Sequence, residues 1–213
     1  MNCGLGSLTT LKALVLPLTL RTRAEWDTQL TAIGKAVAAA FERHCNRRFA
    51  YLAGDTVDVS ADRSFVALPR CPVVTVSAIE LRDSALGAWT SIGAPDSVLF
   101  SLAAESGLAQ FGVVLGSFAQ RLRLTYTGGY FFETLDSTEV GYPTAVPAGS
   151  TPLPDDLQRA WVLAVQAQMD ATDLLRGAAA APAGKTPRNP AAAPAAILTA
   201  DVMEMLRPFI RYT

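Results

Sequence analysis

The sequence predicts an α+β fold in which a helical bundle, made of two long helices and shorter ones, carries an inserted antiparallel β unit. Three observations predict it. Apolar residues recur every three or four positions within residues 24–49 and again within 155–176, and strand-like segments fill residues 51–127 between them. The chain has 213 residues, of which 50% are hydrophobic and only 17% are charged. This length and this composition are sufficient for one domain with a real core.

The first expected element is a short amphipathic helix over residues 8–16. Ser7 or Thr9 can cap its start, and Pro17 stops it. The apolar run that continues to Leu20 has no basic stretch before it and no small-residue cleavage site after it. We therefore do not expect a signal peptide, and no segment approaches the length of a membrane span.

Residues 24–49 predict the first long helix, around which the rest of the chain is organised. Gly34 weakens this pattern by about 1 kcal/mol relative to alanine. The basic residues His44, Arg47 and Arg48 lie where the negative end of the helix dipole favours cations. Its apolar face is the first candidate for packing between subunits, through Trp26, Leu30, Ile33, Val37 and Phe41, and Cys45 continues the stripe as a buried small side chain.

The β unit is expected over residues 51–127. Thr56–Ser60 alternates and Ser64–Leu68 is its expected hairpin partner, while residues 72–81 form a β-branched run that returns at residues 87–92. Weaker strands are expected at 98–102 and 111–115. Residues 121–126 alternate most clearly between apolar and polar, which predicts a strand buried on one face.

A long connection, residues 127–154, leads to the second long helix at residues 155–176. The connection contains the acids Glu133, Asp136 and Glu139 and no basic residue. These acids either belong to an ordinary solvated loop or, if copies of the chain form a ring, are candidate lumen-facing residues that line the lumen with negative charge. Pro154 and two following acids mark the helix start. On its apolar face the candidate subunit-packing residues are Leu157, Trp161 and Val165.

The whole chain is expected to divide into three parts. Residues 1–177 form the main domain, residues 178–196 are an Ala/Pro-rich linker that cannot bury a core, and residues 197–213 form an arm with a short helix. The apolar end of the arm needs a binding site on this chain, on a neighbouring copy or on another protein. Its candidate partner-binding residues are Val202, Leu206, Phe209, Ile210 and Tyr212.

No catalytic, cofactor-binding or metal-binding constellation is found, so we expect neither an enzyme nor a cofactor. His44 is the only histidine, and its neighbour Cys45 points about 100° away on a helix. Asp55, Asp58 and Asp62 lack the spacing of a calcium loop and are interpreted as solvated strand-edge residues. The net charge of −1 leaves no basic excess with which to grip nucleic acid.

Several short motifs, in this order, resemble those of the head–tail connector (adaptor, or head-completion) proteins of tailed bacteriophages. They are Leu8–Leu14, the helix end Cys45-Asn46-Arg47-Arg48-Phe49, the strand opener Cys71–Val76, the segment Leu124–Tyr130 with its Tyr-x-Gly-Gly-Tyr turn, and the helix start Leu153–Leu157.

The resemblance implies a structural virion protein that forms a ring, usually of twelve copies, at the phage neck. Such a ring binds the portal protein on one side and the stopper or tail on the other, and it extends a channel through which DNA passes without specific binding. Assembly in the host cytoplasm and no membrane partner are expected. A stopper or tail-terminator ring, and a small-ligand enzyme, are the alternatives.

Overall fold

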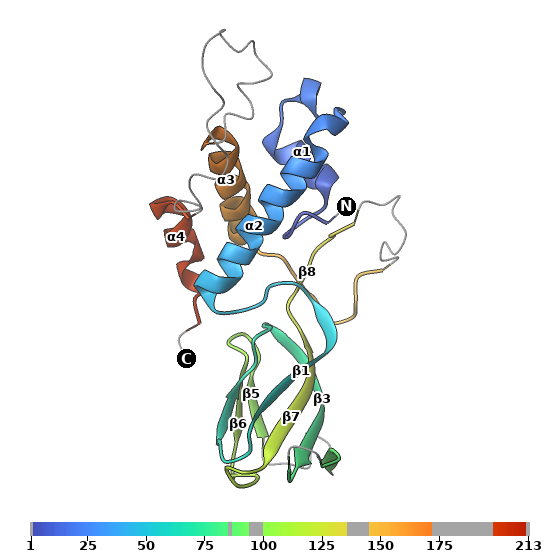
Figure 1. Ribbon diagram of the computed structural model, residues 1–213, viewed down its shortest axis with the longest axis vertical. Coiled ribbons are helices and arrows are strands. Elements are labelled where there is room, and N and C mark those ends of the chain that lie inside the picture. The colour runs from blue at the N-terminus through green and yellow to red at the C-terminus, as the bar shows by residue number, and fades with distance from the viewer. Residues whose placement is uncertain (1, 85–86, 94–99, 136–144, 172–197, 212–213) are drawn as a thin grey trace. The chain divides into compact units, whose positions relative to one another are not determined.

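The computed structural model describes residues 2–84, 87–93, 100–135, 145–171 and 198–211. The chain divides into two compact units (Figure 1). The helical unit comprises Met1–Cys45, Phe132–Thr144 and Leu153–Ile210. The sheet unit comprises Asn46–Phe131, Ala145–Pro152 and Arg211–Thr213. The expected linker, residues 178–196, lies outside the described residues.

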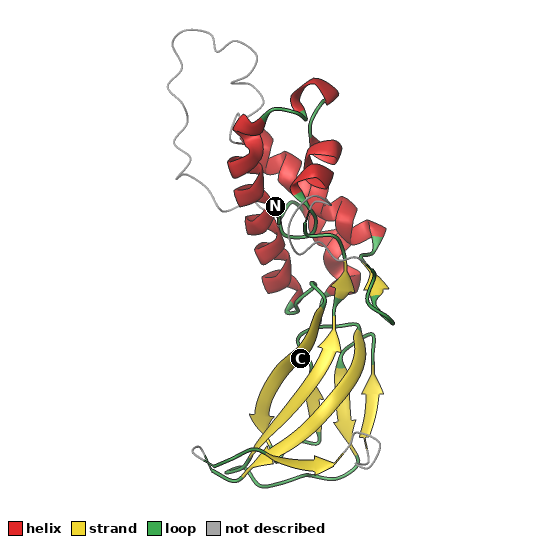
Figure 2. Cartoon of the chain, turned by 90° about the vertical axis from the view of Figure 1, so that its right-hand side faces the viewer, coloured by secondary structure: helices red, strands yellow, loops and turns green. Residues whose placement is uncertain are grey.

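Four α-helices are described, all in the helical unit (Figure 2). They are α1 (Leu8–Val15), α2 (Asp27–Cys45), α3 (Asp155–Ala171) and α4 (Ala200–Leu206), with 3-10 turns at Leu18–Leu20, Ala24–Trp26 and Arg207–Phe209. The Ser7 hydroxyl accepts a hydrogen bond from the Thr10 amide and caps α1, as expected.

In the structure, the helix is shorter at both ends than the long helix predicted over residues 24–49. Its first three residues form a 3-10 turn, so α2 begins at Asp27. It ends at Cys45 because Asn46 adopts a left-handed conformation with φ of 50°, which is how an asparagine commonly ends a helix. Arg47, Arg48 and Phe49 are therefore not helical.

The core of the helical unit closes around Gly34. A Cβ atom there would lie 2.4 Å from the carbonyl oxygen of Cys3, so only glycine lets the N-terminal segment pass over α2. The Trp161 indole of α3 donates a hydrogen bond of 3.1 Å to the Gly34 carbonyl oxygen. Lys12 of α1 forms an ion pair with Asp27 and donates to the carbonyl oxygen of Arg23. The residue that weakens the helical pattern is thus the one that permits close packing.

The sheet unit contains two antiparallel sheets that face each other. The larger has strand order β1-β7-β3-β4 and the smaller β2-β6-β5. The strands are β1 (Leu52–Ser60), β2 (Phe65–Ala67), β3 (Val73–Arg82), β4 (Thr90–Gly93), β5 (Phe100–Ala103), β6 (Leu108–Phe111) and β7 (Arg121–Gly128). A further pair, β8 (Tyr130–Phe131) and β9 (Thr151–Pro152), is parallel and joins the two ends of the predicted long connection.

One strand, β7, dominates the core between these sheets. Leu122, Leu124 and Tyr126 point inward and are fully buried, while Arg121 and Arg123 lie on the outer face. The predicted alternation of this strand is confirmed. The expected hairpin of β1 with β2 is wrong, because β1 pairs with β7 and β2 pairs with β6. The predicted return of β3 into β4 is confirmed.

The predicted fold class, a helical bundle of two long helices with an inserted β unit, is wrong. The described α-helices have 8, 19, 17 and 7 residues and do not organise the whole chain. The strands form several sheets, and two of these enclose an apolar core of their own. A sheet pair with its own core is a second unit and not an insert, because it buries its apolar faces without the helices.

Replacing Gly34 by alanine is expected to lower the free energy of unfolding by about 2 kcal/mol, although alanine favours helices, because the added methyl group overlaps backbone. Urea unfolding followed by circular dichroism measures the change. The matched control is the reverse replacement, Ala39→Gly, at an exposed position of α2, which should cost only about 1 kcal/mol. A stabilised Gly34→Ala chain would contradict this packing.

Candidate interaction surfaces

Metal-binding side chains do not gather anywhere in the described residues. Within those ranges, no group of three or more His, Cys, Asp or Glu side chains could hold a metal ion. His44 lies in the last turn of α2, and the Cys45 thiol is buried with its sulfur 4.0 Å from the Leu206 carbonyl oxygen. Among the described helices, none combines the length and the apolar character that crossing a membrane requires. The candidate sites are therefore surfaces and buried polar clusters.

The clearest polar cluster lies in the sheet unit and is centred on Arg47. Its guanidinium carbon lies 5.3 Å from the centre of the Phe49 ring and 5.4 Å from that of Tyr130. The Arg47 guanidinium also donates a hydrogen bond to the carbonyl oxygen of Cys71. Cations over aromatic faces are stabilised by the ring quadrupole, more so when water is excluded. Arg47 therefore joins three segments that are far apart in the sequence.

A second buried arginine, Arg70, lies in the same unit. It forms an ion pair of 2.9 Å with Asp55 and donates to the carbonyl oxygen of Ala50. The Tyr126 hydroxyl accepts from the Arg70 amide at 3.1 Å and donates to Asp55 at 3.2 Å. We call Arg47, Arg70, Asp55, Tyr126 and Tyr130 the arginine cluster.

Burial and charge shift the pKa values in this cluster. Burial alone would raise the pKa of Asp55, but the hydrogen bond and positive charge of Arg70 outweigh it, so the pKa of Asp55 is lowered. Burial, together with the nearby Asp55 carboxylate, raises the pKa of Tyr126 to about 12. Asp55 thus stays ionised and Tyr126 stays neutral throughout the physiological range. The expectation that Asp55 is a solvated strand-edge residue is wrong.

The outer face of the larger sheet carries paired charges. Arg123 donates two hydrogen bonds, of 2.7 and 2.8 Å, to Asp58, and these bonds lower the pKa of that carboxyl. The centre of the Trp89 ring lies 4.1 Å from the guanidinium carbon of Arg123 and 4.5 Å from that of Arg82. Asp58 also is therefore paired and not simply solvated. On this charged face, Asp58 thus neutralises Arg123.

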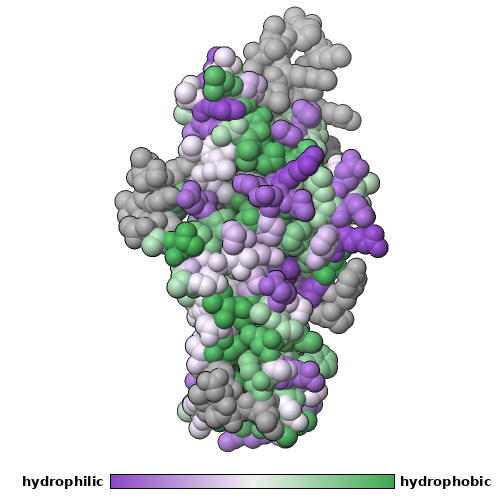
Figure 3. Space-filling view, turned by 180° about the vertical axis from the view of Figure 1, so that it is seen from behind, coloured by the Kyte–Doolittle hydropathy of each residue, from purple (hydrophilic) through white to green (hydrophobic). Residues whose placement is uncertain are grey.

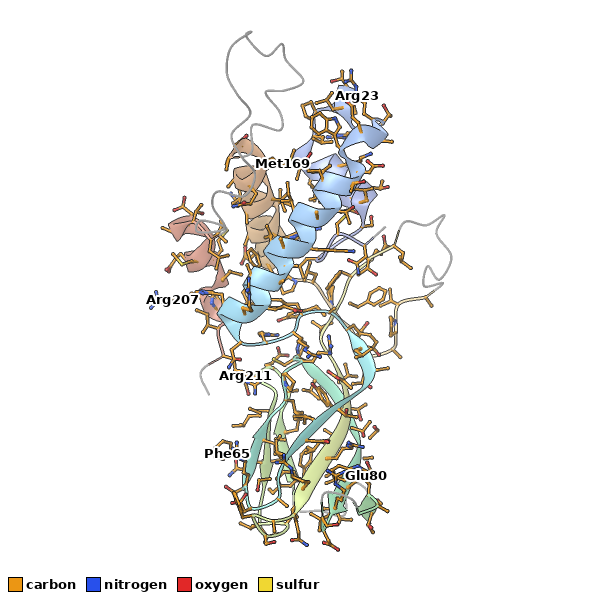
Figure 4. All side chains as sticks on the ribbon, viewed as in Figure 1. Arg23, Phe65, Glu80, Met169, Arg207 and Arg211 are labelled. Atoms are coloured by element: carbon orange, nitrogen blue, oxygen red, sulfur yellow. The ribbon has the colours of Figure 1, made fainter. Side chains whose placement is uncertain are left out.

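The smaller sheet has an outer face without any charged residue. No Lys, Arg, Asp or Glu occurs in β2, β5 or β6. We call this the uncharged face, and its outward residues are Phe65, Ala67, Ser101, Ala103, Leu108 and Gln110. Phe65 is 55% exposed, and it lies on the opposite side of the sheet unit from Glu80 of the charged face (Figure 4).

The loop between β6 and β7 extends this apolar character. Residues 112–120 contain no charge, and Val113, Val114 and Phe118 are all more than half exposed. Hydrogen bonds join the loop to the turn between β1 and β2, for example from the Gly116 amide to the Ala61 carbonyl oxygen at 3.1 Å. Hydrophobic residues are also visible on the surface of the sheet unit in Figure 3. Such exposed clusters mark interaction sites more often than scattered single residues do.

Six of the eight candidate subunit-packing residues are buried within the helical unit itself. These are Leu30, Val37, Phe41, Leu157, Trp161 and Val165, whereas Trp26 and Ile33 are partly exposed. Their role between subunits stays a prediction. A single chain already uses most of this stripe to pack α2 against α3.

The remaining candidates divide between described and undescribed residues. Glu133 is exposed, while Asp136 and Glu139 lie outside the described residues, as does Tyr212. In the arm, Val202 and Leu206 are buried in the helical unit, and Phe209 and Ile210 are partly buried. Sequence reasoning missed the arginine cluster, although three of its residues, Arg47, Tyr126 and Tyr130, belong to the motifs that carry the resemblance.

Comparison with known proteins found no matching family model and no matching curated protein. Two solved structures contain similar chains. One is a virion of a native gene transfer agent (GTA) particle, with a TM-score of 0.53 and 18% identity. The other is the neck of an empty GTA particle, with a TM-score of 0.54 and 18% identity. Each match covers 97% of this chain and 89% of the other. The likeness shows a shared fold.

Replacing Asp55 by asparagine is expected to lower the free energy of unfolding by about 2 kcal/mol at pH 7, since Arg70 loses its charged partner. A carboxyl whose pKa is lowered by folding stabilises the folded chain above its unfolded pKa, about 3.9, and stops doing so as pH falls through the folded pKa. The difference between the two proteins should therefore shrink below about pH 4.

Urea unfolding at several pH values measures this difference. Asp62→Asn, at an exposed turn position, is the control and should change little at any pH. An Asp55→Asn effect that stays constant down to pH 2 would show that the carboxylate charge is not what stabilises the cluster.

Proposed function

We propose that this protein is a non-enzymatic structural component of the neck of a phage-like particle. The observation that carries the proposal is the shared fold, over 97% of the chain, with a chain from the neck of a GTA particle. The connector motifs in the sequence support the same role independently, because they depend on the residues and not on the fold.

In this role, copies of the chain form a closed ring between the portal and the stopper or tail. A ring uses head-to-tail contacts, in which two different surfaces of each copy meet. The uncharged face and the loop at residues 112–120 are suited to one side of such a contact, because they expose apolar residues that gain from being covered.

DNA passes through the ring in this proposal without being held. The net charge is −1, and on the charged face Arg123 already contacts Asp58 while Arg82 contacts the Trp89 ring. Glu133 and its acidic neighbours in sequence would repel phosphates if they face the channel. A wall of this kind suits a passage through which DNA must slide.

A different position in the neck is the second candidate. Stopper and tail-terminator rings tend to be rich in β structure, and the sheet unit with its own core favours this alternative more than the sequence suggested. Binding assays with the isolated portal and the isolated tail separate the two candidates. An adaptor binds the portal directly, whereas a tail terminator binds the tail tube without it.

The proposed ring is tested by electron microscopy and native mass spectrometry of the purified full chain, alone and with its portal. Closed rings of one copy number, seated on the portal, are expected. In particles, deletion of the gene should leave DNA-filled heads without tails. A chain that stays monomeric with the portal present, and whose deletion leaves tailed particles intact, would refute the proposal.

Replacing Phe65 by aspartate should weaken ring assembly by about tenfold or more, because a charge would be buried in the apolar contact. The free energy of unfolding of the monomer should change little, since Phe65 is 55% exposed. Analytical ultracentrifugation measures the assembly. Leu18→Asp, at a residue that is 77% exposed in the helical unit, is the matched control and should assemble normally.

A further inference from the structure

The C-terminal helix α4 is held by the helical unit through two side chains. Val202 and Leu206 are four residues apart and therefore on one face, and both are almost completely buried. α4 packs against α3, and the Leu206 carbonyl oxygen lies 4.0 Å from the Cys45 sulfur at the end of α2. The Thr199 hydroxyl caps the helix start. This is a formed docking site for a short helix.

Seven residues are too few for a helix to be stable in water, so α4 needs this site in order to fold. α4 in turn contacts the site, because the completely buried Cys45 has its sulfur against the Leu206 carbonyl oxygen. Separately, within the sheet unit, Arg211 donates a hydrogen bond of 2.6 Å to the Leu68 carbonyl oxygen. The arm therefore carries specific contacts at both α4 and Arg211.

The chain between α3 and the arm is much longer than a return within one copy requires. α3 has 17 residues, so the start of a helix packed against it lies at most about 35 Å from the end of α3. This distance is the length of α3 plus one helix diameter. Residues 172–197 lie between, and a chain of that length can reach about 90 Å when extended. Its Ala/Pro-rich sequence contains few residues that could form a core.

We propose that in the assembled ring the arm is exchanged between neighbours, so that α4 of one copy occupies the α2–α3 site of the next. This inference rests on the proposed ring. The site and the helix are those seen in the single chain, and only the copy that supplies the helix changes. Exchange of an identical element requires no new interface chemistry and ties each subunit to the next.

The test uses thiols on two different chains. One chain is unchanged and keeps Cys45. The other carries Cys45→Ser together with Leu206→Cys, so neither chain can form a bond between positions 45 and 206 by itself. The two chains are co-expressed with tags of different size, assembled and oxidised with diamide. Exchange predicts a covalent dimer of unlike chains, about tenfold above a control in which exposed Ala200 is replaced by cysteine instead.

Two outcomes overturn the exchange. The first is an assembled ring without the covalent dimer, while a Leu206→Cys chain that retains Cys45 forms the bond within itself. The second comes from a variant that needs no new thiol, deletion of residues 178–191. The remaining connection can reach about 40 Å, which is enough for a return within one copy and leaves less than half of the original reach for a neighbour. Exchange predicts that rings of this variant dissociate at about tenfold higher concentration, and unchanged ring stability refutes it.

Failure of exchange and failure of the proposed function give different results. If the ring forms and the arm stays within its own copy, the neck proposal survives and the exchange does not. If no ring forms with the portal present, both fail. A covalent dimer without any larger ring supports exchange and contradicts the neck ring.

Discussion

A guanidinium held between two aromatic rings is the interaction on which the sheet unit depends. Arg47 lies over Phe49 and Tyr130 and donates to the Cys71 carbonyl oxygen, so the segments leading into β1, into β3 and out of β7 are fixed at one place. Burying a cation is costly unless its hydrogen bonds are made and its charge is met. The contacts of Arg47 come from all three segments, and in the same unit Arg70 lies within reach of Asp55 and Tyr126.

The two sheets then differ sharply in what they expose. The larger presents the Arg123–Asp58 ion pair beside Trp89, whereas the smaller presents an uncharged face beside a loop with three exposed hydrophobic side chains. A sandwich with one face of each kind is suited to repeated association in one direction. Self-paired charges discourage indiscriminate contacts, while the apolar face gains from being covered.

The sequence predicts individual elements of this chain better than their arrangement. The alternation in residues 121–126 identifies β7 correctly, and the stripe of Leu30, Val37 and Phe41 is indeed buried. Strand pairing depends on contacts between residues that are distant in the sequence. The prediction of a local hairpin between β1 and β2 is therefore wrong. The predicted fold class is wrong for a related reason. Periodicity reveals which face of an element is buried, but it does not reveal whether strands bury their faces on helices or on each other.

Side chains that act through tertiary contacts were the least predictable. Asp55 looked like a solvated residue because its partner, Arg70, is distant in sequence and belongs to a different segment. Gly34 looked like a defect because helix propensity contains no information about the Cys3 backbone that passes over it. In both cases a local rule was correct for an isolated segment and was outweighed by a neighbour that only the folded chain supplies.

The position of Trp89 has a practical consequence for watching this protein unfold. Of the three tryptophans, Trp26 and Trp161 belong to the helical unit, and Trp89, between two guanidinium groups, belongs to the sheet unit. A chain with phenylalanine at positions 26 and 161 would therefore emit indole fluorescence from the sheet unit alone. Comparing that signal with far-ultraviolet dichroism of the helices would reveal whether the two units melt as one cooperative body or in succession.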